Sequence, residues 1–213
     1  MIAEKEKNGF KASLAYIFSR NPVLVLGLVI GQLAAGDTTL KNGVALSITY
    51  LLITVPVLVF ASVIGKKLPD WLKIVSYAVL SAAMLLPSYF ICGSISATIF
   101  DSLGIYPALL AVSTVPIVFS SKIAEKQSPA FATVNGLCIS AGFAVTAILL
   151  GAAREFFGNG SLWGFKIAEA SFPAVKLPFW GFILLGFMAA IINWIKDLIK
   201  KTDKNPDGEE ERV

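Results

Sequence analysis

The chain has 213 residues, of which 56% are hydrophobic and 15% are charged. The mean hydropathy of +0.75 and this low charge exclude an ordinary soluble domain, in which about 25% of residues are charged. The chain has no histidine, which excludes a histidine metal site, a Ser-His catalytic pair and a histidine proton shuttle. In such a protein the net charge of +4 indicates membrane topology rather than nucleic-acid binding.

In chain order, residues 1–21 are polar with apolar residues at helical spacing, which predicts an amphipathic segment at the cytoplasmic membrane interface. Residues 22–197 hold enough apolar sequence for six helices of about 20 residues, the length that crosses a bilayer. Residues 198–213 form a charged cytoplasmic tail. The predicted spans are Pro22–Gly36, Val44–Ile64, Trp71–Ile91, Ile105–Phe119, Ala130–Ala152 and Pro178–Ile195. The predicted fold class is an all-α integral membrane protein with six transmembrane helices.

Lysine and arginine are distributed unequally between the two sides of these spans. Counted together with Lys73 at the start of span three, the N-terminal segment, the loops after spans two and four, and the tail contain 14 of them, whereas the other side contains 4. Basic residues remain on the cytoplasmic side. We therefore expect both termini in the cytoplasm, which an even number of spans allows.

The first and fourth predicted spans are short, with about 15 residues against the roughly 20 that a helix needs to cross. They begin 83 residues apart, and each is followed by two longer spans. This short-long-long pattern predicts an inverted 3+3 repeat whose short half-helices, spans one and four, meet near the membrane midplane. The alternative is that each short helix is tilted or is completed by flanking residues.

Few ionisable groups lie near the spans, and acids at membrane depth are candidates for ion pathways because burying a charge is costly. Three carboxylates are predicted at span ends on the outer side, where they would form a ring for cation entry. They are Asp37, Asp101 and Glu155. The alternative is that they are interfacial or capping carboxylates reached by water.

A second set of residues is suited to contacts between helices or subunits. Glycines permit close approach, small polar side chains hydrogen-bond within the membrane, and Arg154 needs a partner separate from that of its neighbour Glu155. The candidates are Gly27, Gly31, Gly36, Gln32, Ser113, Thr114 and Arg154. For the three polar side chains among them, the alternative is that they join helices of the same chain.

The sequence then resembles a known family, the six-span membrane subunits of the Rnf and Nqr respiratory complexes. The resemblance covers about residues 10–197 and is carried by three stretches. They are Asn21-Pro22-Val23-Leu24-Val25, Arg154-Glu155 with Gly158-Asn159-Gly160-Ser161-Leu162-Trp163-Gly164, and Pro178, Gly181, Phe182, Gly186, Ala190 and Asn193. The long loop before span six and the cytoplasmic N-terminus favour the E-type member of Rnf, similar to the D-type member of Nqr.

This resemblance implies a subunit in the inner membrane of a bacterium or archaeon. Its complex would couple electron transfer to translocation of Na⁺ or H⁺, with flavin and iron-sulfur centres on partner subunits. The implied partner is a second six-span subunit of the family, related by a pseudo-twofold axis. In the family, the half-helices of the two subunits together supply four cysteines to one 2Fe-2S cluster.

The chain departs from the family at the cysteine positions, which match Gly31 and Thr114. Its two cysteines, Cys92 and Cys138, lie elsewhere and are too few to hold a cluster alone. The chain is then either a subunit without a cluster, which we favour, or one whose metal centre is held mainly by the partner. We expect no metal site or cofactor on this chain alone, and no catalytic residue. Alternatives are a stand-alone secondary transporter for a small solute or ion, or a membrane anchor for a peripheral enzyme.

Overall fold

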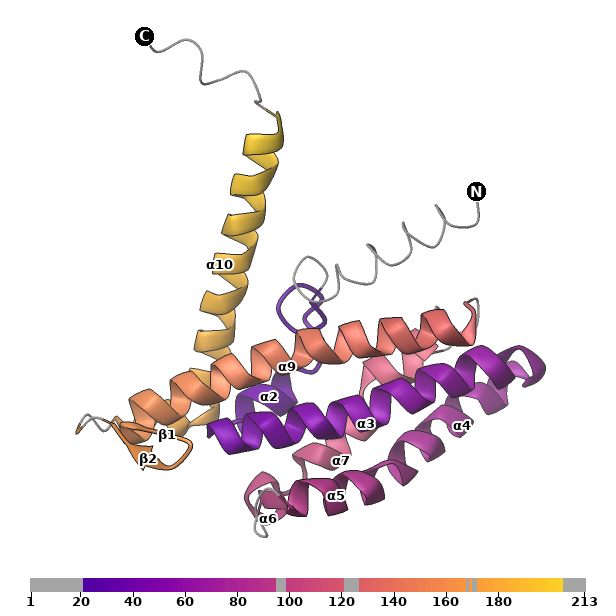
Figure 1. The fold of residues 1–213 in the computed structure, drawn as a ribbon, viewed down its shortest axis with the longest axis horizontal. Coiled ribbons are helices and arrows are strands. Elements are labelled where there is room, and N and C mark those ends of the chain that lie inside the picture. Colours follow the sequence, from indigo (N-terminus) through magenta and orange to yellow (C-terminus); the bar gives the residue numbers. More distant parts are fainter. Residues whose placement is uncertain (1–20, 95–98, 121–126, 168, 170–171, 205–213) are drawn as a thin grey trace.

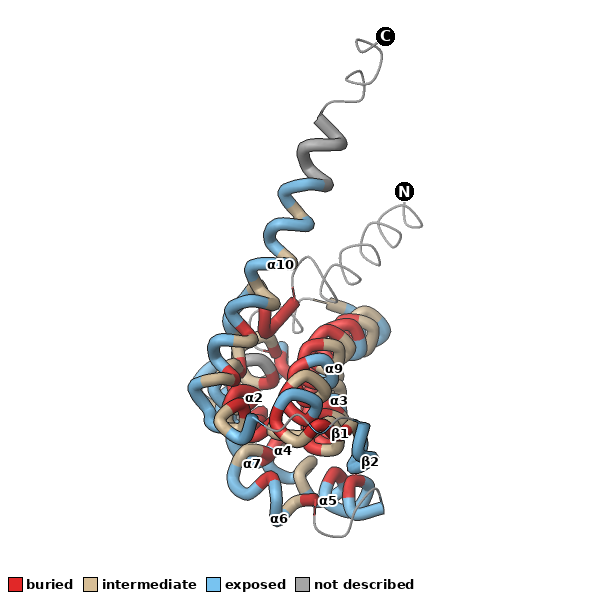
Figure 2. The backbone as a smooth tube through the Cα atoms, turned by 90° about the vertical axis from the view of Figure 1, so that its left-hand side faces the viewer, coloured by how far each residue is buried: buried red, intermediate tan, exposed pale blue. Residues whose placement is uncertain are grey.

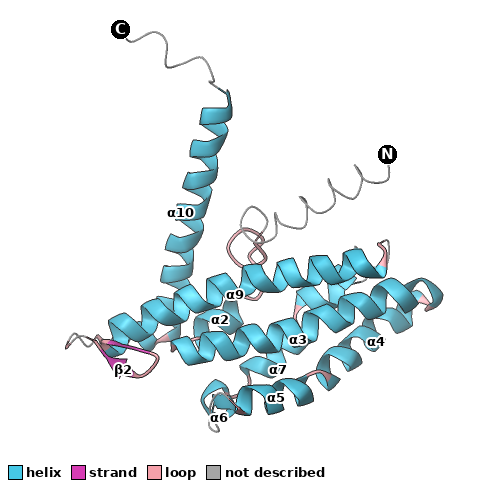
Figure 3. Ribbon diagram, viewed as in Figure 1, coloured by secondary structure: helices cyan, strands magenta, loops and turns pink. Residues whose placement is uncertain are grey.

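The computed structural model describes residues 21–94, 99–120, 127–167, 169 and 172–204. These residues are mainly helical, with one short antiparallel hairpin (Figure 1, Figure 3). In the described part, four stretches are long and apolar enough to cross a membrane, namely 40–67, 70–93, 129–159 and 178–198. The predicted interfacial segment lies outside the described residues except for Asn21, and so does the end of the predicted tail, 205–213.

The described elements have the following bounds. The α-helices are α2 (Ile30–Gly36), α3 (Leu40–Ile64), α4 (Asp70–Ala83), α5 (Leu85–Gly93), α6 (Ile99–Leu103), α7 (Tyr106–Ala111), α9 (Pro129–Asn159) and α10 (Pro178–Lys204). The shorter elements are the turns η1 (Gly65–Lys67) and η4 (Pro173–Lys176), the π-helical turn η2 (Val115–Phe119), and the strands β1 (Ser161–Leu162) and β2 (Phe165–Lys166).

Side-chain caps and prolines explain several of these boundaries. The Thr39 hydroxyl accepts the N–H of Asn42 at 3.3 Å, so α3 begins four residues before the predicted Val44. At the start of α9, the Ser128 hydroxyl accepts a backbone N–H of the first turn. Predicted span three is divided at Met84 into α4 and α5. Pro87 contributes to this break because it has no N–H to donate to the carbonyl four residues earlier.

The core of the described part is the antiparallel pair α3 and α9 (Figure 1). Gly43 of α3 lies against the carbonyl of Ala147, whereas Gly136 of α9 lies against Val55. Without a Cβ, these glycines let the two backbones approach closely. Between them the rings of Tyr50 and Phe143 stack with centroids 4.1 Å apart. Most of the buried residues gather along these two helices (Figure 2).

Both short predicted spans are broken segments. Residues 22–26 form a turn, Val29 has a φ of 55°, and α2 then has only seven residues. A β-branched residue rarely adopts a positive φ, so packing must hold this break in place. In predicted span four, α7 ends at Ala111, and η2 follows after the bend at Ser113. Neither segment is a continuous membrane-crossing helix.

The C-terminal helix α10 extends away from the α3 and α9 pair (Figure 1). Near its start, Gly181 lies directly against the backbone of Ala34 in α2. Further along, large apolar side chains such as Phe187 and Trp194 are 66% and 64% exposed. Figure 2 shows that much of the described part of α10 belongs to the exposed class. The helix continues to Lys204, beyond the predicted span end at Ile195, so the first residues assigned to the tail are helical.

Candidate functional site

The most polar region of the described core surrounds Arg154, near the C-terminal end of α9. This side chain is fully buried, and each of its five N–H donors points to a backbone carbonyl. Nη1 donates to the carbonyls of Ala34 and Asp37 at 2.7 and 2.8 Å. Nε donates to the carbonyl of Val175 at 3.1 Å, and Nη2 donates to those of Lys176 and Leu177.

These carbonyls lie at the C-terminal ends of two short helices. Ala34 and Asp37 belong to the end of α2, and the other three belong to the end of η4. The last carbonyls of a helix have no partner within the helix and carry partial negative charge. Arg154 therefore anchors α2 and the start of α10 to α9.

Glu155 makes the opposite kind of contact. Its Oε2 accepts the N–H of Leu40 at 2.9 Å, at the positive N-terminal end of α3. Its Oε1 accepts the N–H of Gly164 at 2.8 Å and the hydroxyl of Ser161 at 3.2 Å. Three donors thus satisfy this buried carboxylate and hold the hairpin against α3 and α9.

The glycines after Glu155 permit this hairpin. Gly160 ends α9 with a φ of 63°, in the left-handed conformation that glycine adopts readily. Trp163 and Gly164, the two residues that connect β1 to β2, both have positive φ, as a type I′ turn requires. The turn directs the N–H of Gly164 toward Glu155. In the stretch from Arg154 to Gly164, which carries part of the family resemblance, the Glu155 carboxylate thus holds the hairpin loop in place by hydrogen bonds.

The carbonyl of Asp37 belongs to this network, but its side chain does not. Its side chain is 0% exposed, and neither carboxylate oxygen has a hydrogen-bond partner among the described residues. A Cβ on Gly151 would lie 2.5 Å from Oδ1, so only glycine fits there. Burial raises the pKa of the Asp37 carboxyl well above its ordinary value, although the Arg154 charge and the Gly151 backbone lower it. Asp37 lies in the linker between α2 and α3, outside the membrane-spanning helices.

Asp37 and Glu155 are buried, so the expectation that water reaches them was wrong, whereas a capping role fits Glu155 at the start of α3. Their part in an ion pathway stays a prediction. Glu155 is 3% exposed, because α9 continues to Asn159 instead of ending at Ala152. The predicted span ended before Arg154 and Glu155 because both side chains are charged. Since both have hydrogen-bond partners inside the fold, α9 continues past them. Asp101, in contrast, is exposed on α6.

A side-chain amide connects α6 to this region. The hydroxyl of Ser102, next to Asp101, donates to Oδ1 of Asn42 at 3.0 Å. The amide nitrogen of Asn42 donates to the Thr38 hydroxyl and to the carbonyl of Gly36, at 3.2 and 3.3 Å. The first turn of α3 is therefore the place near which the three candidate acids lie. Sequence reasoning missed Asn42, although its spacing from the capping residue Thr39 was a usable signal.

Asn21 has a comparable role at the start of the described chain. Its amide nitrogen donates to the carbonyl of Gly142 at 2.8 Å and to the Thr146 hydroxyl at 3.2 Å, both on α9. Its oxygen accepts the N–H groups of Val23 and Leu24, which closes the turn after Pro22. Asn21 is thus buried against α9, although the prediction placed it in the interfacial segment. The sequence had indicated this motif only as a weak resemblance.

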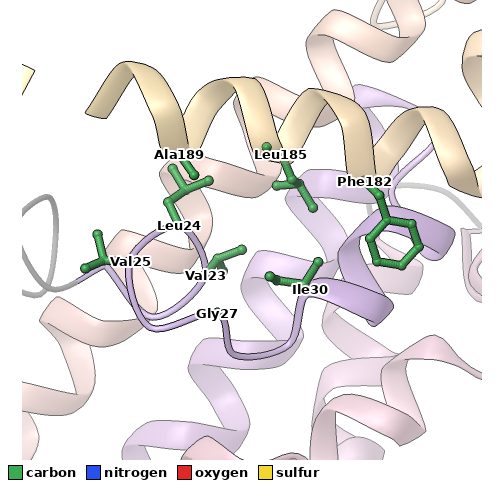
Figure 4. A pocket seen from close by; sticks show the side chains of 9 residues that line it. Val23, Leu24, Val25, Gly27, Ile30, Phe182, Leu185 and Ala189 are labelled. Carbon is green, nitrogen blue, oxygen red and sulfur yellow. The ribbon is translucent and has the colours of Figure 1, made fainter. Parts of the chain in front are cut away.

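The three candidate glycines have different surroundings. Gly36 is buried, and a Cβ there would lie 2.8 Å from the ring of Tyr106 in α7, so the two short spans touch at this point. Gly31 is exposed, with open space where a Cβ would be. Gly27 has a φ of 68° and borders a cavity of about 240 Å³ between the N-terminal turn and α10 (Figure 4). The side chains lining this cavity are apolar, including Val23, Phe182 and Leu185.

The remaining candidates are dispersed. Gln32 is half-buried on α2, and Thr114 is exposed. Ser113 is buried, and its hydroxyl has no hydrogen-bond partner among the described residues. For these three side chains, for the three glycines and for Arg154, a role in contacts between subunits stays a prediction.

The residues present do not fit an iron-sulfur cluster bound at the family positions. Gly31 has no side chain and Thr114 offers only a hydroxyl, so neither supplies a thiolate. Cys92 is buried on α5, with its Sγ 3.6 Å from the carbonyl of Ala45, and Cys138 is buried on α9. No group of three or more cysteine, aspartate or glutamate residues that could hold a metal ion occurs in the described ranges.

Known proteins resemble this chain over much of its length. The profile of the family described as "Rnf-Nqr subunit, membrane protein" matches residues 10–189. The E subunit of the proton-translocating ferredoxin:NAD(+) oxidoreductase complex of Clostridium ljungdahlii is 28% identical over 129 residues, which cover 59% of this chain and 58% of that protein. The E subunit of the ion-translocating oxidoreductase complex of Sodalis glossinidius is 30% identical over 138 residues, which cover 57% of each chain.

A third relative matches over its whole length. The E subunit of the ion-translocating oxidoreductase complex of Aliivibrio fischeri (strain MJ11) is 26% identical over 231 aligned residues, which cover 100% of this chain and 99% of that protein. In the first two matches, this chain spans somewhat more than half the length of its relative. Because the family profile covers most of the sequence, the chain belongs to the Rnf-Nqr family of membrane subunits.

Proposed function

We propose that this chain is the E-type membrane subunit of a complex that couples electron transfer to ion translocation. The family match over residues 10–189 is the observation that carries this proposal, together with three relatives that are each named as the E subunit of such a complex. In this proposal the chain is not catalytic alone. Flavin and iron-sulfur centres on other subunits transfer the electrons, because this chain lacks cysteines at the family positions.

The proposal includes six spans arranged as an inverted 3+3 repeat. The antiparallel pairing of α3 with α9, which correspond to the second span of each half, supports this arrangement. Contact between the two short segments, at Gly36 of α2 and Tyr106 of α7, supports it as well. With the basic residues on the cytoplasmic side, both termini would face the cytoplasm, and the complex would lie in the inner membrane.

The partner in this proposal is a second six-span subunit of the same family, related by a pseudo-twofold axis. Two features of the described surface support an additional protein contact. Gly31 offers open space beside α2, and α10 leaves large apolar side chains uncovered. Surrounding lipid and the partner would together cover these surfaces.

Within this subunit, Arg154 and Glu155 position the short helix α2 and the hairpin, and the acids at the first turn of α3 line the ion pathway. Arg154 binds the carbonyl ends of α2 and η4, whereas Glu155 binds the N-terminal end of α3. Asp37, Glu155 and Asp101 all lie at or near this turn.

Co-purification of the full chain tests the proposal. A tagged copy is expressed in its native cells and purified from membranes in a mild detergent, and the bound subunits, flavin and iron are then identified. We expect the sister membrane protein and subunits that carry flavin and iron-sulfur centres. Isolation of the chain without them, with solute uptake when it is reconstituted alone in liposomes, would instead establish a stand-alone transporter.

A further inference from the structure

Three buried ionisable side chains lie close together near the N-terminal end of α3: Arg154, Glu155 and Asp37. The five donors of Arg154 all meet carbonyls, and the carboxylate of Glu155 accepts three hydrogen bonds. The polar atoms of both side chains therefore have hydrogen-bond partners within the packed chain. Asp37 differs from them, because neither oxygen of its buried carboxyl group has such a partner among the described residues.

The surroundings of Asp37 stabilise a negative charge only in part, because burial outweighs the favourable effects of the Arg154 charge and the Gly151 backbone. Both of its oxygens lack a partner among the described residues, and Oδ1 is enclosed by Gly151 of α9 and Gly43 of α3. The Arg154 guanidinium attracts it, but its donors are already engaged by carbonyls, including that of Asp37 itself. An ionised carboxylate buried without donors is unfavourable, so the group must be neutralised.

No other ionisable group on the packed elements supplies that neutralisation. Glu155 carries the same sign of charge. Lys41 of α3 and Lys176 of η4 are only half-buried, and no ion pair joins either of them to Asp37 in the described residues. On α7, the group that faces this region is the ring of Tyr106, which covers Gly36. α2 carries no ionisable side chain.

A proton suits this position better than a metal ion. Hard cations need about six oxygen ligands, whereas the carbonyl oxygens that lie with Asp37 Oδ1 around Gly151 and Gly43 are those of Thr39 and Ala147. The adjacent Arg154 charge would also repel a cation. A protonated carboxyl gains an O–H donor, and the carbonyl oxygens of Thr39 and Ala147 lie close to it, around Gly151 and Gly43.

We infer that Asp37 is a proton-binding site, at which the chain carries a neutral carboxylic acid at neutral pH and releases the proton when the packing around α2 opens. Release leaves the carboxylate beside Arg154, whose charge then stabilises it, and the proton passes to water. The proton site itself does not depend on the proposed function. Its physiological role does, because within the proposed complex this site would make H⁺ the ion that the subunit handles.

Infrared spectroscopy of the intact purified complex tests the inference. We expect a band of a protonated carboxyl at neutral pH that shifts when the protein carries ¹³C-labelled aspartate, and that is lost in Asp37→Asn. The matched control is Asp101→Asn, which removes an exposed acid next to Ser102 and should retain the band. The labelled wild-type protein gives the answer even if Asp37→Asn fails to assemble.

Two results would overturn the inference. One is the absence of a protonated aspartate band at neutral pH in the labelled wild-type complex. The other is loss of that band when Na⁺ is added at constant pH, which would make Asp37 a sodium ligand. If the complex retains all of its subunits, either result refutes the inference about Asp37 but leaves the proposed function intact. Purification of the chain without partner subunits would instead refute the proposed function.

Discussion

Replacement of Arg154 by methionine should strongly destabilise the chain. Methionine fills much of the volume but leaves five carbonyls at the ends of α2 and η4 without their donors, and it removes the positive charge beside Asp37. Removing one partner of a buried charged network costs about 3–5 kcal/mol. For a chain of this size we expect the melting temperature to fall by on the order of 10 °C.

Replacement by lysine separates charge from geometry. Lysine keeps the charge but has three donors in place of five, so at least two carbonyls lose their hydrogen bond. Each unsatisfied buried group costs about 1–3 kcal/mol, and we expect Arg154→Lys to melt between the wild type and Arg154→Met.

Thermal unfolding in detergent, followed with a thiol-reactive dye, measures this series. The buried free thiols of Cys92 and Cys138 become reactive only when the fold opens. Lys166→Met is the matched control, because Lys166 is an exposed cation on β2. Equal melting of Arg154→Met and the wild type would refute the anchoring role. Equal melting of Arg154→Lys and the wild type would show that the forked geometry of arginine contributes nothing.

Three further predictions concern assembly, pH and iron. Gly31→Leu should reduce co-purification of the sister membrane protein at least several-fold, whereas Val63→Leu, at another exposed position, should not reduce it. Equal yields of the sister protein with both variants would remove the case for a close contact at α2. Because burial raises the pKa of Asp37, the folded chain holds a proton that the unfolded chain has lost, so its contribution to stability falls as pH rises from about 4 through the folded-state pKa. In Asp37→Asn the melting temperature should therefore depend less on pH over this range than it does in the wild type. The same pH dependence in both proteins would contradict the assignment of the buried proton to Asp37. The double variant Cys92→Ser with Cys138→Ser should leave the iron content of the complex unchanged, and loss of iron would show that this chain ligates a cluster.

The sequence alone determined the class of protein and most of its long elements. Apolar length predicted the four long helical segments, because a stretch that must avoid water over about 30 Å has to be long and nearly free of charge. The glycines and prolines of the short segments indicated that these segments are interrupted. The Arg154-Glu155 motif and the glycines that follow it indicated the family, which the comparison confirmed.

Only the tertiary structure decided what the polar residues do. Arg154 bonds to Ala34, which lies 120 residues away, and Glu155 bonds to Leu40, which lies 115 residues away. No local sequence pattern encodes such pairs. The prediction from hydrophobicity therefore ended the span at Ala152 and placed Arg154 and Glu155 in water. Burial of Asp37 likewise depends on α2, α3 and α9 meeting at glycines, which is a property of the packed fold. Hydrophobic length therefore determined where the helices are, whereas packing between distant segments determined which charges are buried and which of them have partners.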